Sequence, residues 1–302
     1  MLQALIAFIQ EQVTGLTTTL DVGSWKALVL GLVEGITEFI PISSTGHLVL
    51  AESMLGLDTP PDLKHATDTF IIVIQGGAIL AVLGLYWPTI VRMSRGLMGH
   101  DRDGLRLFLN ICIAFVPAAV VGLLVHGWID RYLMDDLPVI IFLALGGLLM
   151  VFVGRGNIFQ RTDGPDSLSA LRPRHALVIG FSQCFAMLPG MSRSMVTIVG
   201  GMFVGLSPAR SAEFSFLLGL PTLVAACLYR LVVDSNDKGH MDKMDMLEHM
   251  GAVPVILGFI TATLTSAIAI KWLVAYLKRH GLAAFGWYRI GFAILMALVL
   301  LT

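Results

Sequence analysis

The sequence predicts an all-α integral membrane protein with six transmembrane helices and two re-entrant helical hairpins, arranged as two repeats of opposite topology. Three observations predict this fold: the composition, the long apolar stretches, and two similar segments that Pro, Ser and Gly interrupt. Of 302 residues, 56% are hydrophobic and 14% are charged, whereas a soluble domain carries about 25% charged residues. This composition excludes a water-soluble enzyme, a nucleic-acid-binding protein and a disordered chain. Because the net charge is only −1, any site for an anion must be local.

Six uninterrupted apolar stretches are long enough to cross a bilayer, which takes about 20 residues. They comprise residues 70–88, 107–129, 137–154, 214–233, 251–273 and 284–301. The connections between them alternate in charge along the chain. Eleven Lys and Arg residues lie in one set, formed by 89–106, 155–174 and 271–281, and four lie in the other, formed by 57–69, 130–136 and 234–250. The positive-inside rule therefore places the first set in the cytoplasm.

Two further apolar segments, 26–57 and 175–206, are each broken near the middle. As helices their halves extend only about 22 Å, whereas the hydrocarbon core of a bilayer is about 30 Å thick. We therefore expect each segment to enter the membrane, turn inside it and leave on the same side. The free backbone groups of such a turn must be buried in protein or line a wet cavity. One long kinked helix for each segment is the alternative, and it would disturb the alternation of charge.

The two broken segments align without gaps, which indicates an internal repeat. The alignment places Glu34 on Gln183, Ser43 on Ser192 and Ser44 on Arg193. We predict a single membrane domain, 1–302, with a first repeat at 24–154 and a second at 175–302, after an N-terminal extension, 1–23, of no assigned function. Each repeat holds one hairpin and three spans, and because three is odd the second copy lies upside down. Interrupted segments at matching places in inverted repeats point to a site at the membrane midplane.

Two carboxylates lie inside the first apolar hairpin. Glu34 and Glu38 are four residues apart and so share one face of a helix. Ionisable groups inside a membrane are costly and by default functional. They predict ligands for a divalent cation such as Mg²⁺ or Ca²⁺, or a pair that shares proton transfer. A purely structural pairing with an arginine of the other repeat is the alternative.

The turn after Glu38 is rich in hydroxyl groups. Pro41 ends the first helix, and Ser43, Ser44 and Thr45 precede Gly46 and His47 at the start of the next. A helix N-terminus with free N–H groups and nearby hydroxyls can bind an anion. His47, one turn into the helix, can donate or accept a proton or act as a nucleophile near neutral pH.

The second turn adds a cation to the same arrangement. Ser192, Arg193 and Ser194 begin its second helix, and Thr197 lies one turn later on the same face. A buried arginine needs an anionic partner, and its planar guanidinium suits a phosphate. The alternative is an ion pair with Glu34 or Glu38 that only holds the fold, and both can hold before a ligand binds.

Other polar residues of the apolar stretches carry weaker indications. Gln75 can reach the site or join two helices, and Glu213 is expected to cap or pair at the start of a span. Arg289 and Lys271 lie near the ends of spans, where long cationic side chains can extend to the interface.

Two long segments, 31–47 (GLVEGITEFIPISSTGH) and 189–197 (PGMSRSMVT), carry a specific resemblance, which 73–76 and 211–218 support. The chain is similar to the undecaprenyl-pyrophosphate phosphatase family of the bacitracin-resistance type, found in bacterial inner membranes. The resemblance implies hydrolysis of undecaprenyl diphosphate to the monophosphate, which recycles the lipid carrier for cell-wall synthesis, and dependence on a divalent cation. It also implies an active site at Glu34, Glu38, Ser44, His47, Ser192, Arg193 and Thr197. A likeness to type-2 phosphatidic-acid phosphatases fails, because the histidine that they need six residues after the arginine is Val199 here.

Combining the residues with the resemblance gives an expected mechanism. We expect Glu34, Glu38, Ser44, His47 and Arg193 to be catalytic, with Glu34 and Glu38 holding the metal. The diphosphate would be bound by Ser43, Thr45, Ser192, Arg193, Ser194 and Thr197. The nucleophile is either Ser44 or a water activated by His47, with a slight preference for Ser44.

The competing function is an inverted-repeat transporter or flippase for an anion or a polyprenyl phosphate. A purely structural membrane subunit would leave the buried ionisable residues unexplained. If the positive-inside assignment holds and the cavity opens outward, dephosphorylation occurs on the periplasmic side, and we expect the site to open there. The expected partners are the polyprenyl diphosphate and the bilayer, without nucleic acid, and a homo-oligomer is compatible with the sequence.

Overall fold

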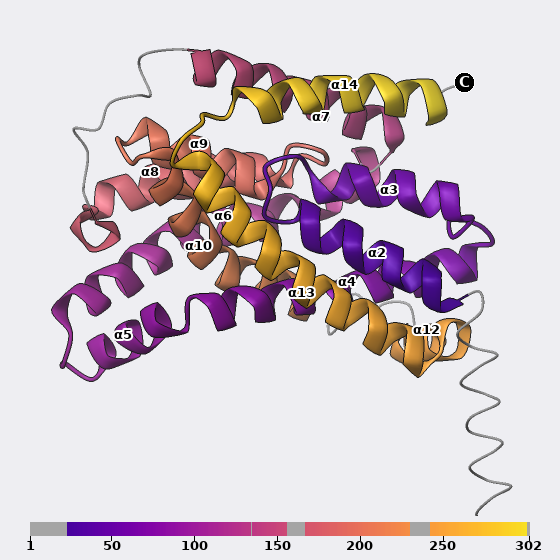
Figure 1. Ribbon diagram of the computed structural model, residues 1–302, viewed down its shortest axis with the longest axis horizontal. Helices are drawn as coiled ribbons and strands as arrows, with labels where there is room; N and C mark the ends of the chain where they lie inside the picture. Colours follow the sequence, from indigo (N-terminus) through magenta and orange to yellow (C-terminus); the bar gives the residue numbers. More distant parts are fainter. Residues whose placement is uncertain (1–22, 134, 156–166, 230–241, 301–302) are drawn as a thin grey trace, which may run out of the picture.

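The computed structural model describes residues 23–133, 135–155, 167–229 and 242–300, which form helices and contain no strand. Six of these helices are long and apolar enough to cross a membrane (Figure 1). They are α4 (Pro61–Leu85), α6 (Arg102–Tyr132), α7 (Asp136–Arg155), α10 (Pro208–Tyr229), α13 (Ala252–Leu277) and α14 (Ala283–Leu300). The all-α fold and the six apolar helices of spanning length are confirmed.

Three of these helices begin five or more residues earlier than hydropathy alone predicts, and one of them is α6, which begins at Arg102 instead of residue 107. α4 begins at Pro61 instead of residue 70, because Pro61 and Asp62 favour the first turn of a helix. α10 likewise begins at Pro208 instead of residue 214. The connection 234–250 contains a short helix, α12 (Asp242–Met250), that the sequence did not indicate. The N-terminal extension lies outside the described residues, except for Gly23.

Both interrupted segments form pairs of short helices. α2 (Gly23–Thr37) is followed by α3 (Ser44–Leu55), and α8 (Pro173–Cys184) by the 3₁₀ turn η3 (Phe185–Met187) and α9 (Arg193–Phe203). Within each pair the two helices contact each other. The Lys26 side chain, near the start of α2, donates a hydrogen bond of 2.7 Å to the Leu55 carbonyl at the end of α3. The segment 26–57 therefore folds back on itself and is not one long kinked helix.

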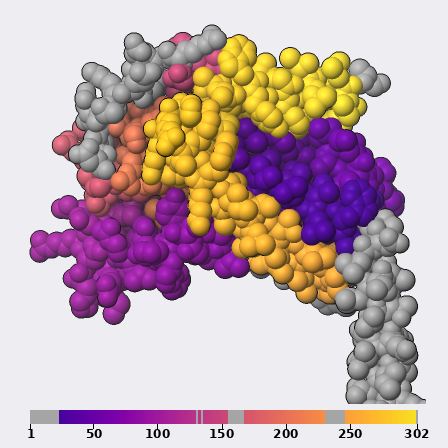
Figure 2. Space-filling view, in the orientation of Figure 1, coloured from indigo at the N-terminus to yellow at the C-terminus, as the bar shows by residue number. Residues whose placement is uncertain are grey.

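The turns of the two pairs meet near the centre of the molecule (Figure 1). α13 packs along α2 and α4, α6 packs on α8, α14 on α7, and α10 on α9. In the space-filling view α13 crosses the visible face diagonally (Figure 2). The buried core beside the turns includes Phe39, Met195, Phe216 and Leu273. This core holds both turns between longer helices.

The corner between α5 (Trp87–Leu97) and α6 lies at the end of the molecule that is rich in arginine. Asp101 caps α6 by accepting a hydrogen bond of 2.8 Å from the Gly104 amide, and Arg92 donates to it at 3.1 Å. The Gly104 amide, followed by Arg92, holds the pKa of Asp101 below its ordinary value. One carboxylate thus fixes both the start of α6 and the position of α5.

Candidate active site

Each turn ends in a serine whose backbone lies in the left-handed region. Ser43 has φ 76° and Ser192 has φ 73°, and they are the only non-glycine residues with positive φ in the described chain. Each caps the following helix: the Ser43 hydroxyl accepts from the Gly46 amide, and the Ser192 hydroxyl from the Met195 amide. A non-glycine residue in this region costs about 1–3 kcal/mol and is concentrated at functional sites. The two turns therefore share one strained geometry at aligned positions.

A buried ion pair connects the two turns. Arg193 Nη2 donates to Glu38 Oε1 at 3.0 Å, and the two side chains are 10% and 6% exposed. The Ser44 hydroxyl donates to the other oxygen of the same carboxylate, Glu38 Oε2, at 2.8 Å. Glu38 thus binds the cation of one turn and the hydroxyl of the other. A carboxylate bonded to a serine hydroxyl is placed to accept its proton.

α10 holds the guanidinium of Arg193 in place. Nη1 donates to the Ser215 carbonyl at 2.9 Å, and the guanidinium lies 5.7 Å from the centre of the Phe39 ring. Gly219 provides the necessary room, because a Cβ there would lie 2.5 Å from Nη1. Neither Ser215 nor Gly219 was expected from the sequence, since only packing reveals which helix faces Arg193.

Gly219→Ala is expected to displace the guanidinium without changing any charge. The hydrogen bonds to Ser215 and Glu38 would be strained or lost, and hydrogen bonds to charged groups contribute about 1.5–3 kcal/mol each. We expect kcat/KM for phosphate release from a polyprenyl diphosphate to fall by about tenfold or more, since about 1.4 kcal/mol corresponds to a factor of ten. Gly84→Ala is the matched control, because nothing lies within 4 Å of a Cβ at that helical glycine. Equal rates for the two variants would contradict the assignment.

Glu34 differs from Glu38 in having an oxygen without a partner. Its side chain is 1% exposed, and Oε1 accepts no hydrogen bond from any described residue. A buried carboxylate oxygen is costly unless it is paired or binds a metal. This orphaned oxygen, beside Glu38, fits a hard divalent cation. No group of three or more metal-ligating side chains occurs in the described part of the chain, so water and substrate oxygens would complete the coordination.

His47 is fixed by a helix from the end of the chain. Its Nδ1 lies 2.7 Å from the Ser43 carbonyl, its Nε2 lies 2.8 Å from the Tyr288 hydroxyl, and its ring stacks on Phe292 at 3.9 Å. A carbonyl can only accept, so the neutral ring carries its proton on Nδ1 and Nε2 accepts from Tyr288. Here Ser44 donates to Glu38 and not to His47. If His47 takes part in proton transfer, it acts through Nε2.

Tyr288→Phe removes the hydrogen bond to His47 Nε2 and keeps the ring. We expect kcat to fall by about threefold to tenfold, since a neutral hydrogen bond contributes about 1 kcal/mol. We also expect a changed pH–rate profile and little change in KM. Tyr132→Phe, at an exposed tyrosine of α6, is the matched control. A wild-type profile for Tyr288→Phe would show that this bond plays no part in the reaction.

Most of the other hydroxyls predicted to bind diphosphate already have partners in the protein. Thr197 is 1% exposed and bonds to the Arg193 carbonyl at 2.8 Å and to the Ser215 hydroxyl at 2.6 Å. Ser194, also buried, donates to the Ile40 carbonyl at 3.4 Å. Thr45 is exposed. Thr197 and Ser194 thus position Arg193 and the turns, whereas Ser44 and Thr45 are accessible.

Arg289 is the main correction to the sequence analysis. It does not extend to an interface: the side chain is completely buried. Its guanidinium donates to backbone carbonyls of both turns and of α7. The acceptors are Gly190 (2.8 Å), Met191 (3.1 Å), Leu143 (3.2 Å), Pro41 (3.4 Å) and Phe142 (3.4 Å). One side chain therefore satisfies the irregular backbone where the two turns meet, as a low-dielectric environment requires.

Arg289→Met is expected to destabilise the protein markedly. Each buried carbonyl that loses its donor costs about 1–3 kcal/mol, so we expect a fall of several degrees or more in the thermal unfolding midpoint in detergent. Arg95→Met, at an exposed arginine of α5, should leave the midpoint nearly unchanged. Equal midpoints would mean that water replaces Arg289 at no cost.

A cavity of about 680 Å³ reaches both turns. Glu34, Ser44 and Thr45 line it from the first turn, and Pro189 from the second. Farther out it is lined by polar residues of three helices, α3, α4 and α6: Glu52, Lys64, Asp68, Gln75 and His126. Lys64 lies 3.5 Å from Glu52 and 3.7 Å from Asp68. The accessible hydroxyl of Ser44 thus faces a polar space large enough for a diphosphate.

Comparison with known proteins shows the family of this chain. A family model described as bacitracin resistance protein BacA matches residues 27–295. The chain belongs to the BacA family. A protein named undecaprenyl-diphosphatase from Sorangium cellulosum (strain So ce56) is 43% identical over 90% of this chain and 85% of its own length. A protein of the same name from Cereibacter sphaeroides (strain ATCC 17029 / ATH 2.4.9) is 41% identical over 90% of this chain and 94% of its own length. Another, from Clostridium tetani (strain Massachusetts / E88), is 37% identical over 88% of this chain and 92% of its own length.

The BacA match includes both turns and α14, from which Tyr288 and Arg289 extend. With its six apolar helices, this BacA-family chain is a multi-pass membrane protein. The resemblance inferred from the two motifs is confirmed.

Proposed function

We propose that this chain hydrolyses undecaprenyl diphosphate to undecaprenyl phosphate and inorganic phosphate, and so recycles a lipid carrier for cell-wall synthesis. One observation carries the proposal: Glu38 pairs with Arg193 of the opposite turn and accepts the hydrogen bond of Ser44, a residue that lines the cavity. Family membership and the names of the relatives agree with it. A passive anion carrier has no need of a carboxylate bonded to an accessible serine.

Arg193 is proposed to bind the diphosphate, helped by the N-terminal amides of α3 and α9. As the diphosphate binds, the guanidinium exchanges Glu38 for the phosphate oxygens, which leaves the carboxylate bonded to Ser44. Glu38 then takes the proton of Ser44, whose oxygen forms a bond to the terminal phosphorus. The bond from that phosphorus to the bridging oxygen breaks, and undecaprenyl phosphate leaves with the electron pair.

Hydrolysis of the phosphoserine completes the turnover. Water attacks the phosphorus and gives a proton to His47, while the bond to Ser44 breaks and the protonated Glu38 returns its proton to the serine oxygen. His47 then releases its proton to solvent. Direct attack by a water that His47 activates is the alternative route. The 2.8 Å bond between Ser44 and Glu38 favours the serine route.

A divalent cation, Mg²⁺ or Ca²⁺, is proposed to be held by Glu34 and Glu38. When bound, such a cation would offset the negative charge of the diphosphate oxygens. The unpartnered Glu34 Oε1 supports this assignment.

We further propose that both helix pairs are re-entrant and that the two repeats are inverted. If the two halves are repeats, α2 corresponds to α8, α4 to α10, α6 to α13 and α7 to α14. The contact between α2 and α13 then has its counterpart in the contact between α8 and α6, and both are present. The corresponding helices α4 and α10 also contact each other, as do α7 and α14. The aligned glycines Gly31 and Gly180 both lie against a backbone carbonyl of the partner helix, that of Gly258 and of Ala114. Close approach at small residues is typical of helices packed in membranes.

The proposed location is the bacterial inner membrane, with the cavity open to the periplasm. The cavity reaches Lys64 near the start of α4, and the arginine-rich end of the molecule lies at the opposite end of that helix. The positive-inside rule assigns the arginine-rich end to the cytoplasm, so the start of α4 would face the periplasm.

Cysteine labelling tests this orientation in intact spheroplasts, with a variant that lacks the native cysteines. Asp62→Cys should react with an impermeant maleimide, whereas His100→Cys should not. The reverse result would invert the assignment.

The proposed activity is tested by phosphate release from undecaprenyl diphosphate by the purified chain in detergent. The assay is run with Mg²⁺, with Ca²⁺ and with chelator, beside Glu38→Ala, His47→Ala and Arg193→Ala. We expect metal-dependent release that all three variants lose. A carrier would retain anion binding in His47→Ala, and a folded wild-type protein that releases no phosphate would contradict the proposal.

A further inference from the structure

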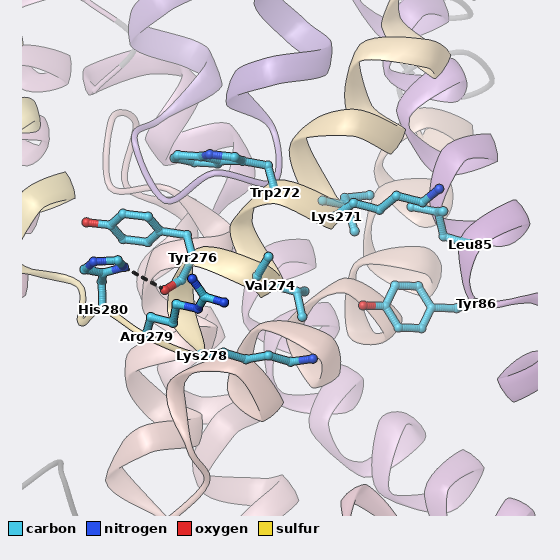
Figure 3. A pocket seen from close by; sticks show the side chains of 11 residues that line it. Leu85, Tyr86, Lys271, Trp272, Val274, Tyr276, Lys278, Arg279 and His280 are labelled. Carbon is cyan, nitrogen blue, oxygen red and sulfur yellow. Dashed lines mark hydrogen bonds between the residues drawn. The ribbon is translucent and has the colours of Figure 1, made fainter.

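A second cavity, of about 730 Å³, lies far from the active site. It is formed where the end of α13 approaches the junction of α4 and α5 (Figure 3). Leu85 and Tyr86 line it at one end of α4, whereas Lys64 lines the active-site cavity near the other end. At 1.5 Å per residue the two positions are about 30 Å apart along the helix, a full bilayer core. The two cavities therefore open at opposite faces of the molecule.

The lining of this second cavity is strongly cationic. Lys271, Lys278 and Arg279 line it, all three are exposed, and none forms an ion pair with a described carboxylate. The carboxylate of Glu213, which lies near Tyr86, is paired with Arg210 at 2.7 Å. Figure 3 shows the Tyr86 hydroxyl directed toward the space beside Val274. The cavity thus offers positive charge and a hydroxyl to an anion.

Aromatic and apolar side chains complete the cavity. Trp272 and Tyr276 lie one turn apart on α13, and the His280 ring lies just beyond its end; successive ring centres are 5.3 Å and 4.5 Å apart. Leu85 and Ile270 give the cavity an apolar wall. Tryptophan and tyrosine are enriched at the level of lipid headgroups. The cavity therefore combines an apolar surface and aromatic rings with cations that form no ion pair with a described carboxylate.

We infer that this cavity binds the headgroup of an anionic phospholipid, whose phosphodiester lies between the Lys278 and Arg279 side chains. Basic cavities between helices on the cytoplasmic side suit such headgroups. Two other effects could account for cations at the C-terminal end of a helix: they interact favourably with the helix dipole, and they help to set the orientation of the chain in the membrane. Neither effect requires a cavity. The inference is independent of the proposed hydrolysis, because this cavity shares no residue with the active site.

The test measures binding of phosphatidylglycerol to the full-length protein reconstituted in phosphatidylcholine nanodiscs. Lipid retention is followed by native mass spectrometry, and stabilisation by the thermal midpoint. We expect Lys278→Gln/Arg279→Gln to weaken phosphatidylglycerol binding about thirtyfold, since each basic residue strengthens the attraction of anionic lipid about fivefold. The matched control is Arg95→Gln/Arg102→Gln, which removes two exposed charges from the same end of the molecule but outside the cavity.

The outcomes separate a site from diffuse attraction. Selective loss in the cavity variant supports the inference, whereas equal loss in both variants overturns it. A parallel titration uses inorganic phosphate: retention of phosphatidylglycerol in its presence supports a lipid site, and complete displacement at millimolar phosphate would identify free phosphate as the ligand instead. Size-exclusion profiles and phosphate release by the cavity variant, both expected to match wild type, show that the variant is folded.

Discussion

Arg193→Lys is expected to lower kcat for phosphate release by about a hundredfold or more, the usual effect of losing one donor that stabilises developing charge. The guanidinium uses separate nitrogens for Glu38 and the Ser215 carbonyl, at 3.0 Å and 2.9 Å. An ammonium is a compact charge without this planar fork, so it cannot hold the Ser215 carbonyl while it exchanges Glu38 for a phosphate. The measurement is kcat and KM with undecaprenyl diphosphate, together with the thermal midpoint.

The control for this substitution is Arg210→Lys. Arg210 lies on α10 and pairs with Glu213, but its side chain is 48% exposed and the pair lies outside the two turns. We expect wild-type kinetics, because exposed ion pairs contribute little. If Arg193→Lys kept its rate within about threefold of wild type and only lowered the midpoint, Arg193 would serve the fold alone, since loss of a transition-state contact must lower kcat.

Hydropathy and turn chemistry were enough to predict the six long helices and both turns. Pro41 and Pro189 mark the breaks, and the serines after them become helix caps at the aligned positions Ser43 and Ser192. The expected alternative for Arg193, an ion pair with Glu38, is present in the structure. A pairing between residues 155 positions apart was foreseeable only because a buried arginine and a buried glutamate each need a partner.

The contribution of α14 could not be predicted in the same way. Tyr288 and Arg289 are consecutive, so they leave the helix about 100° apart. One contacts His47 of α3, and the other the carbonyls of both turns. An arginine in an apolar stretch was a signal, but its position near the predicted end of a span suggested extension to the interface. Backbone carbonyls carry no mark in a sequence, and five of them determine where this guanidinium lies.

Glu38→Gln and Glu34→Gln are expected to separate proton transfer from metal binding. Glu38 contacts both Arg193 and Ser44, so its amide variant removes the proton acceptor and the anionic partner of Arg193. We expect kcat to fall by about 10²–10⁴, the range for loss of a general base. Glu34 contacts neither, and its free oxygen is the one suited to a cation. We expect Glu34→Gln to raise the Mg²⁺ concentration for half-maximal rate by about tenfold or more, as removal of a hard oxygen ligand should.

The measurement is the rate of phosphate release as a function of Mg²⁺ concentration at saturating substrate, for wild type and both variants. Glu52→Gln is the control, because Glu52 is also buried and lines the same cavity but pairs with Lys64 away from the turns. A fall in maximal rate confined to Glu38→Gln would assign the base to Glu38, because added metal cannot restore a missing proton acceptor. If Glu38→Gln instead raised only the Mg²⁺ requirement and kept the maximal rate, Glu38 would be a metal ligand and not the base, and His47, held by Tyr288 and Ser43, would be the remaining base.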